Sequence, residues 1–222
     1  MSKSSNIEVI VVLDGYWPEP KEIINDKRVI YIHFSQARGM RNAINSAVSV
    51  SNGEYILKTD AHCLFDKDFD TKLKADIENN WIVIPRRYAL DPVKWSIEER
   101  TDNKYPIDVM VLDDGLQAIP TEERKDNSII DTESFQGSAW FMKKDYFYKL
   151  GLMDEEKYGS FWQEAQEMGL KCKQDGGRVV RNTKTWYSHQ HKTKGRGYSL
   201  QADKDKTRLA IRKLYEETKH IN

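Results

Sequence analysis

Asp60 and His62 are the two side chains whose types and spacing point most directly to chemistry. One residue, Ala61, separates them, and they come directly after segment 54–59, which is expected to form a strand. In extended backbone, residues two apart point to the same side, so a carboxylate oxygen and an imidazole nitrogen can meet one cation. This ligand pair suits Mn²⁺ and also Zn²⁺. The competing explanation is a surface aspartate beside a hydrogen-bonded histidine at the end of a strand.

A second pair of histidines lies far along the chain. His189 and His191 follow the last expected strand and precede the basic segment 192–197. A distant histidine can complete the ligand set begun by Asp60 and His62. A basic loop beside it can clamp a pyrophosphate whose other oxygens bind the metal. A solvated loop that contains two histidines by chance is the alternative.

Two further pairs of charged residues have spacings that suit a binding site. Glu164 and Glu167 fall one turn apart on an expected helix, where carboxylates can hold sugar hydroxyls or supply a base. Arg38 and Arg41 lie at or near the start of another helix, where backbone amides already favour anions. For both pairs, a solvated helix surface is an equally good explanation.

The elements that must position these residues alternate between strands and helices. Ile7–Leu13 is a β-branched run closed by Asp-Gly, which is typical of a buried parallel strand. The other expected strands cover 29–34, 54–59, 81–85, 135–142 and 178–181, and the expected helices cover 39–51, 68–79, 145–150, 161–174 and 203–220. This alternation predicts an α/β layered fold, in which ligands bind at the carboxyl ends of strands.

The bulk composition narrows the class of protein. The 222 residues suffice for one domain and its core. The 35 basic and 35 acidic residues cancel, which gives no argument for binding to nucleic acid or to a membrane surface. Cys63 and Cys172 make no disulfide framework, and no segment approaches the roughly 20 apolar residues of a membrane span. We therefore expect a soluble, cytoplasmic protein.

Segment 86–131 breaks the alternation of strands and helices. It is polar, carries scattered prolines and has no sustained period, as is common for a functional loop or lid. We expect one domain over residues 1–200, with 86–131 as an irregular insertion or lid. Residues 201–222 are expected to form an amphipathic C-terminal helix, whose apolar positions are Leu209, Ile211, Leu214 and Tyr215.

Five segments, taken in chain order, resemble the family 2 glycosyltransferases of the GT-A class. They are VIVVLDG (9–15), ARGMRNAINSAVSVSNGEYILKTDAHC (37–63), QGSAWFMKKDYFYKLGLMDE (136–155), SFWQEAQEMGLKCKQDGGRV (160–179) and YSHQHK (187–192). The spelling D-A-H-C at 60–63 is more similar to the polypeptide N-acetylgalactosaminyltransferases. Each motif is weak alone, but the five stand in the right order and cover roughly residues 7–85 and 135–192.

The resemblance implies a metal site and a donor site. Asp60, His62 and His189 would bind Mn²⁺, or Mg²⁺, through a D-x-H variant of the D-x-D motif. The donor would be a nucleotide sugar, with UDP as the expected nucleotide. The residues implied to contact its base, diphosphate or sugar, or to fold over it, are Asp14, Arg38, Arg41, Gln136, Gly137, His191 and Arg196.

The same resemblance implies the reaction. Glu164 falls where the family contacts the transferred sugar, and Glu167 would be a second catalytic carboxylate. Inverting members place an aspartate after this glutamate, whereas Ala165 follows Glu164 here, so inversion and retention both stay open. The acceptor stays open among a glycan, a protein, a small molecule and a modified nucleic acid. The competing functions are a catalytically silent nucleotide-sugar or glycan-binding module, and a metal-dependent hydrolase.

The resemblance also implies the architecture. It is the GT-A fold, a Rossmann-like nucleotide-diphospho-sugar transferase with a mixed, mostly parallel sheet flanked by helices. Family members begin with another strand and helix before the strand that resembles 9–15. The fold is therefore expected to be N-terminally shortened. Another segment, a second subunit or a homo-oligomer would then supply the missing strand.

Overall fold

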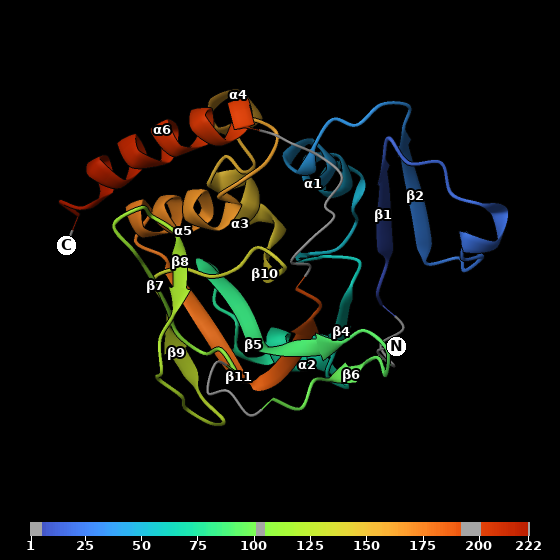
Figure 1. Ribbon diagram of the computed structural model, residues 1–222, viewed down its shortest axis with the longest axis horizontal. Coiled ribbons are helices and arrows are strands. Elements are labelled where there is room, and N and C mark those ends of the chain that lie inside the picture. Colours follow the sequence, from blue (N-terminus) through green and yellow to red (C-terminus); the bar gives the residue numbers. More distant parts are fainter. Residues whose placement is uncertain (1–5, 101–104, 192–200, 222) are drawn as a thin grey trace.

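The computed structural model describes residues 6–100, 105–191 and 201–221, without the side chains of 201–203 (Figure 1). Its strands are β1 Val9–Asp14, β2 Val29–Phe34, β3 Tyr55–Thr59, β4 Cys63–Phe65, β5 Trp81–Asp91, β6 Ser96–Ile97, β7 Met110–Leu112, β8 Ala118–Pro120, β9 Ile129–Asp131, β10 Ala139–Lys143 and β11 Arg178–His189. Its helices are α1 Met40–Val50, α2 Phe69–Asp76, α3 Lys144–Lys149, α4 Glu155–Tyr158, α5 Glu164–Gln174 and α6 Gln201–Thr218, with a short 3₁₀ turn at Pro20–Glu22.

The longest sheet lies at the centre of the molecule and follows the order β3-β10-β5-β11-β4. β6 extends it beside β5, and β9 extends it beside β11. β5 and β11 are parallel neighbours, whereas β10 runs antiparallel to both β3 and β5, and β4 runs antiparallel to β11. The α/β class and the mixed sheet are thus confirmed, but the expected mostly parallel pairing is wrong. The reason is that β10 enters the sheet from the opposite end and separates β3 from β5.

β1 and β2 form a parallel sheet of their own, in register from Val9 opposite Val29 to Asp14 opposite Phe34. In the described part of the chain, no other strand pairs with β1, and β3 pairs with β10 alone. The carboxylate of Glu8 joins the two sheets at one end, because Oε1 accepts hydrogen bonds from the backbone nitrogens of Asn52 (2.5 Å) and Gly53 (3.0 Å), just before β3. The expected N-terminal shortening stays a prediction.

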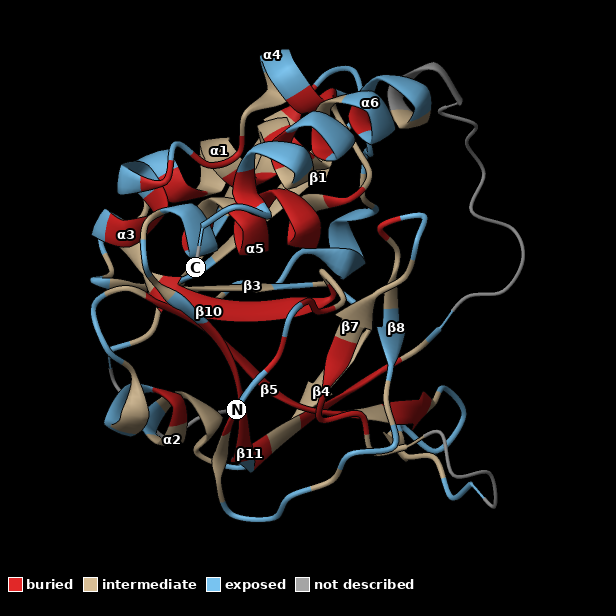
Figure 2. Cartoon of the chain, turned by 90° about the vertical axis from the view of Figure 1, so that its left-hand side faces the viewer, coloured by how far each residue is buried: buried red, intermediate tan, exposed pale blue. Residues whose placement is uncertain are grey.

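The central sheet is covered on both faces (Figure 2). On one side lie α1, α3 and α5, and the core between them and the sheet is built around Trp140, Phe147 and Met168. On the other side lies α2, whose Leu73 packs in a smaller cluster with Val83. Burial of such side chains contributes about 1.5–3 kcal/mol each, so the two cores hold the strand ends of the site in place.

Segment 86–131 is more ordered than its composition indicates. It contains the second half of β5 and the short strands β6 to β9. Ile107 and Met110 are buried, and the Arg86 guanidinium makes two hydrogen bonds to the buried Asp108 carboxylate (2.7 and 2.6 Å). Much of this segment therefore belongs to the packed domain, because apolar residues and several ion pairs anchor it to the sheet.

The expected C-terminal helix is present as α6, which packs against α4 and α5. Ile211 and Leu214 are buried under it, whereas Leu209 is 75% exposed and faces away from the core. Among the described residues, no helix combines the length and the apolar character that crossing a membrane requires.

Candidate active site

Asp60, His62 and His189 meet at one edge of the central sheet. Asp60 follows β3, His62 lies in the turn before β4, and His189 ends β11, where it pairs with Cys63 of β4. Oδ2 of Asp60 lies 3.2 Å from Nε2 of His189 and 4.0 Å from Nε2 of His62, and the two imidazole rings lie 4.7 Å apart. One ligand atom from each residue lies within 4.8 Å of the others. One carboxylate oxygen and two imidazole nitrogens so placed fit a divalent transition metal such as Mn²⁺.

Lys58 holds the Asp60 carboxylate in this orientation. Its ammonium donates to Oδ1 of Asp60 (2.6 Å) and to the carbonyl oxygen of Gly137 (2.5 Å). Burial alone would raise the pKa of Asp60. The hydrogen bond from His189, together with the charge and hydrogen bond of Lys58, outweighs this effect and holds the pKa well below its usual range. Asp60 therefore stays ionised at neutral pH, with Oδ1 bound to Lys58 and Oδ2 turned toward the histidines.

Gly137 lies between this cluster and Glu164. The backbone of Ser138 accepts a hydrogen bond from the nitrogen of Asp60 (2.9 Å), which sets the segment 136–138 directly beside the metal ligands. A Cβ atom at Gly137 would lie 1.8 Å from Oε1 of Glu164, so the carboxylate rests on the bare glycine. The structure thus connects the two candidate metal and sugar sites through one glycine.

The sequence profile of the family described as Glycosyl transferase family 2 matches residues 2–151, more than half of the 222-residue chain. The chain belongs to this family. No curated protein matches it by sequence.

Solved structures of similar fold include three of low sequence identity to this chain. "GalNAc-T7 with UDP, GalNAc and Mn2+" aligns with a TM-score of 0.72 at 16% identity, over 94% of this chain and 41% of that one. The mannosyltransferase PcManGT from Pyrobaculum calidifontis, in complex with GDP-Man and Mn2+, gives 0.52 at 14% identity, over 94% and 60%. S. aureus TarS 1-349 in complex with UDP-GlcNAc gives 0.56 at 12% identity, over 96% and 58%. The fold is therefore the expected GT-A fold. This chain spans about 41 to 60% of the length of these proteins.

The loop before Glu164 holds an uncommon backbone conformation. Trp162 and Gln163 have φ values of 88° and 51°, in the left-handed region that side chains other than glycine rarely adopt. The carbonyl oxygen of Trp162 accepts from Nη2 of Arg41 (2.9 Å), and the Gln163 amide donates to the carbonyl oxygen of Leu116 (3.1 Å). These bonds hold the strained turn and direct Glu164 toward Gly137. Strained backbone conformations of this kind are common in functional sites.

Arg41 and Glu167 pair with each other in the interior of the domain. Both side chains are fully buried, and Nε of Arg41 donates to Oε2 of Glu167 at 2.9 Å. The other Glu167 oxygen accepts from the nitrogen of Asp154 and from Lys171, both at 2.9 Å. The pair ties α1 to α5, and Arg41 also supports the loop before Glu164. The expected roles of Arg41 at the donor and of Glu167 as a catalytic carboxylate stay predictions.

Asp14 and Arg38 meet at the end of β1, on the other sheet. Oδ1 and Oδ2 of Asp14 accept hydrogen bonds from the backbone nitrogens of Arg38 (2.6 Å) and Gly39 (2.9 Å). Gly39 has a φ of 93°, and a Cβ there would lie 2.5 Å from that of Ser160. The Asp14 loop thus packs on the loop before Glu164, while none of the described Arg38 contacts reaches Asp60. The expected roles of both residues at the donor stay predictions.

The remaining expected residues have three different placements. The ring of His191 lies 6.5 Å from that of His189, next to the metal ligands. Gln136 is half-buried beside Gly137. Arg196 lies outside the described residues. Their contacts with a donor stay predictions.

Lys58 and Arg87 are site residues that the sequence reasoning missed. Arg87 is 1% exposed on β5, and its Nη2 donates to Nδ1 of His189 at 3.3 Å. Lys58 stands two positions before Asp60 on a strand, so period-2 alternation alone would have placed it near that carboxylate. Arg87 lies beyond the expected end of its strand, and no sequence pattern pointed to it.

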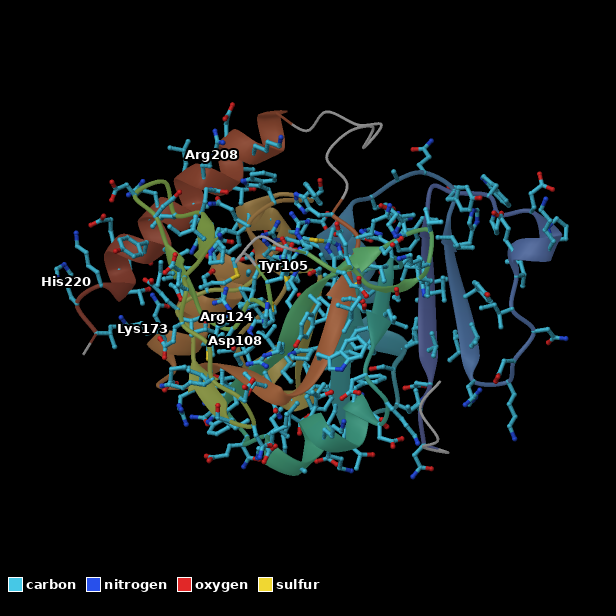
Figure 3. All side chains as sticks on the ribbon, turned by 60° about the horizontal axis from the view of Figure 1, so that its bottom comes forward. Tyr105, Asp108, Arg124, Lys173, Arg208 and His220 are labelled. Atoms are coloured by element: carbon cyan, nitrogen blue, oxygen red, sulfur yellow. The ribbon has the colours of Figure 1, made fainter. Side chains whose placement is uncertain are left out.

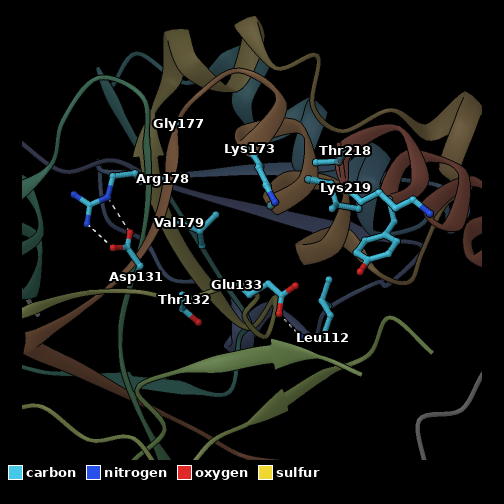
Figure 4. Close-up of a pocket in the computed structure, with 13 residues that line it drawn as sticks. Leu112, Asp131, Thr132, Glu133, Lys173, Gly177, Arg178, Val179, Thr218 and Lys219 are labelled. Atoms are coloured by element: carbon cyan, nitrogen blue, oxygen red, sulfur yellow. Dashed lines mark hydrogen bonds and ion pairs between the residues drawn. The ribbon is translucent and has the colours of Figure 1, made fainter. Parts of the chain in front are cut away.

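Figure 4 shows a cavity of about 360 Å³ that is lined by other residues. Its lining includes Asp131, Glu133, Lys173 and Arg178. Arg178 is already held by two hydrogen bonds to Asp131 (2.8 and 2.9 Å), and Glu133 accepts from the backbone of Leu112 (2.9 Å). None of the metal-ligand candidates lines this cavity, so we do not place the reaction there.

Proposed function

We propose that the chain is a metal-dependent glycosyltransferase that takes a sugar from a nucleotide sugar, with UDP as the nucleotide. The observation that carries this proposal is the convergence of Asp60, His62 and His189 at the strand ends of a family 2 domain. Two of the structural neighbours are complexes with a nucleotide or nucleotide sugar and Mn²⁺, which supports the same metal here.

The metal would be held by Asp60, His62 and His189. When bound, it would offset the charge that develops on the leaving nucleoside diphosphate. Lys58 keeps one carboxylate oxygen of Asp60 engaged, so that the other stays directed at the histidines. In the metal-free protein, Nη2 of Arg87 donates to Nδ1 of the His189 ring.

Glu164 is the proposed catalytic carboxylate. It is half-buried, begins α5 and rests on Gly137, so its oxygens lie where a sugar hydroxyl or an attacking acceptor can be bound. The Arg41–Glu167 pair and the Trp162–Gln163 turn fix its position from behind. If Glu164 accepts a proton from the acceptor, the reaction inverts; if it only binds the sugar, retention stays open. Screening candidate acceptors identifies the acceptor class.

Calorimetric titration of UDP into the purified chain, with Mn²⁺ and then with EDTA, tests the proposal. Micromolar binding that needs the metal is expected, followed by slow Mn²⁺-dependent turnover of a UDP-sugar. Binding without any turnover would instead favour the silent binding module. The absence of binding with and without metal would refute the donor assignment for this chain.

Replacing Gly137 with alanine is expected to slow sugar transfer while the domain stays folded. The new Cβ would overlap Oε1 of Glu164, and the flexible carboxylate must move aside. A displaced reacting group costs roughly 100-fold in rate. Turnover and thermal unfolding of Gly137→Ala, beside Gly169→Ala as control, check this. Gly169 lies on α5 with no atom closer than 3.5 Å to an added Cβ. Equal rates in both variants would contradict a role for Glu164 at this position.

A further inference from the structure

The buried arginines of the central sheet differ in how their charges are met. Arg86 is 8% exposed and makes a two-bond ion pair with Asp108 (2.7 and 2.6 Å). Arg181 is fully buried and donates to the carbonyl oxygens of Asp108 and Pro85, both at 2.8 Å, which leaves only its Nη2 without a partner among the described residues. Each of these guanidinium groups therefore has strong acceptors within the protein.

Among the described residues, Arg87 has no such acceptor. It is 1% exposed, and its one side-chain hydrogen bond runs from Nη2 to Nδ1 of His189 (3.3 Å). Among the described residues, Nε and Nη1 are buried without a hydrogen-bond partner. No carboxylate of the described chain forms an ion pair with this guanidinium. An arginine cannot give up its proton in a protein, so the charge persists in this position.

A buried, unmatched cation is unfavourable, and native structures rarely keep one without a reason. Arg87 sits directly behind a ligand of the proposed metal site. A guanidinium offers paired N–H donors that match the oxygens of a phosphate. A divalent cation and an unpaired arginine on either side of one imidazole together suit a polyanion better than a neutral sugar.

We propose that Arg87 receives a phosphate oxyanion of the substrate, beside the Asp60–His62–His189 site. This inference rests on the proposed function and adds a residue to it. The oxyanion engages Nε and Nη1, which have no hydrogen-bond partner among the described residues of the free protein.

The phosphate can belong to the donor or to the acceptor, and Arg87 has a neighbour that suits each. On one side lies His189, which leads to the diphosphate of a donor at the metal. Arg87 also contacts Tyr105, whose ring centre is 5.5 Å from the Arg87 guanidinium carbon; Tyr105 is labelled in Figure 3. Tyr105 also lines a cavity of about 310 Å³ with Pro106, Glu122 and Arg124. A phosphate-bearing acceptor would approach from that side.

The test replaces Arg87 with methionine and measures unfolding and binding separately. Without ligand, Arg87→Met is expected to unfold at the same or a higher temperature than the wild type, because it removes an unmatched buried charge. Arg181→Met is the matched control from the neighbouring strand, and it should unfold at a lower temperature because it strands two buried carbonyl oxygens. A fall for Arg87→Met as large as that for Arg181→Met would make Arg87 a packing residue and overturn the proposal.

Binding is measured with Mn²⁺ present, using UDP, pyrophosphate and glycerol 3-phosphate as separate probes. Affinity for the phosphate probe that Arg87 meets should fall roughly 10-fold to 100-fold in Arg87→Met, and less in Arg87→Lys. A loss confined to UDP and pyrophosphate assigns the donor, whereas a loss confined to glycerol 3-phosphate assigns an acceptor. Equal affinity of wild type and Arg87→Met for all three probes would overturn the proposal and leave the proposed function intact. A wild type that binds pyrophosphate through Arg87 but not UDP would keep the anion site and refute the function.

Discussion

Replacing Asp60 with asparagine is expected to abolish the metal-dependent binding of UDP and, with it, sugar transfer. Oδ2 of Asp60 is the carboxylate oxygen directed at both histidines, and it supplies the only negative charge of the three-residue cluster. An amide of the same shape keeps the packing but loses that charge. Because a bound metal contributes several kcal/mol to stabilising developing charge, the rate should fall roughly 100-fold or more.

Calorimetry with UDP and Mn²⁺, and turnover of a UDP-sugar, measure this effect. Asp26→Asn is the control, because Asp26 is also ion-paired, to Arg28 at 2.7 Å, but precedes β2 on the outer sheet. The Asp60→Asn protein should unfold cooperatively, since its side chain is partly exposed. If Asp60→Asn bound UDP with wild-type affinity in Mn²⁺, the three-residue metal site would be refuted.

The proximity of Asp60 and His62, two of the three candidate metal ligands, was predictable because its signal is local. Asp60 and His62 follow a strand directly, and the strand's end fixes where both side chains lie. His189 lies 129 residues from Asp60, so its place beside Asp60 depended on a family resemblance rather than on spacing. The prediction that Glu164 and Gly137 both lie at the transferred sugar likewise depended on the family resemblance.

Burial of charge was not predictable in the same way. A glutamate one turn from Glu164 has the same sequence pattern whether it faces a substrate or a buried arginine. Only the fold brings Arg41 within 2.9 Å of Glu167, across 126 residues. Arg87 is the reverse case: its neighbourhood with His189 arises from the parallel pairing of β5 and β11, which no local pattern encodes.

The order of the strands was predictable only in part. Segments 54–59 and 81–85 were recognised as strands, but their alternation with helices suggested parallel neighbours. The structure inserts β10 between them, in the antiparallel sense, after the chain has passed through 86–131. That segment appeared irregular because its strands are two or three residues long and cannot show a period.

Removing one partner of the Arg41–Glu167 pair is expected to be the most destabilising single change in the domain. Glu167→Ala would leave a fully buried guanidinium without its carboxylate, at a cost of roughly 3–5 kcal/mol. For a chain of this size, that corresponds to a fall of roughly 6–20 °C in the unfolding temperature. Lys171→Met removes only the partly exposed partner of Glu167, and its effect should be far smaller.

The double variant Arg41→Met/Glu167→Leu separates a structural role from a role at the donor. Replacing both charges with apolar side chains removes the unmatched charge, so stability should recover well above that of Glu167→Ala. If the pair is structural, the double variant should also recover UDP binding in Mn²⁺, because its packing again supports the loop before Glu164. If Arg41 instead met the donor diphosphate, as the family resemblance implies, stability would recover while UDP binding stayed lost. Thermal unfolding and calorimetry on the same three variants therefore decide the role of Arg41.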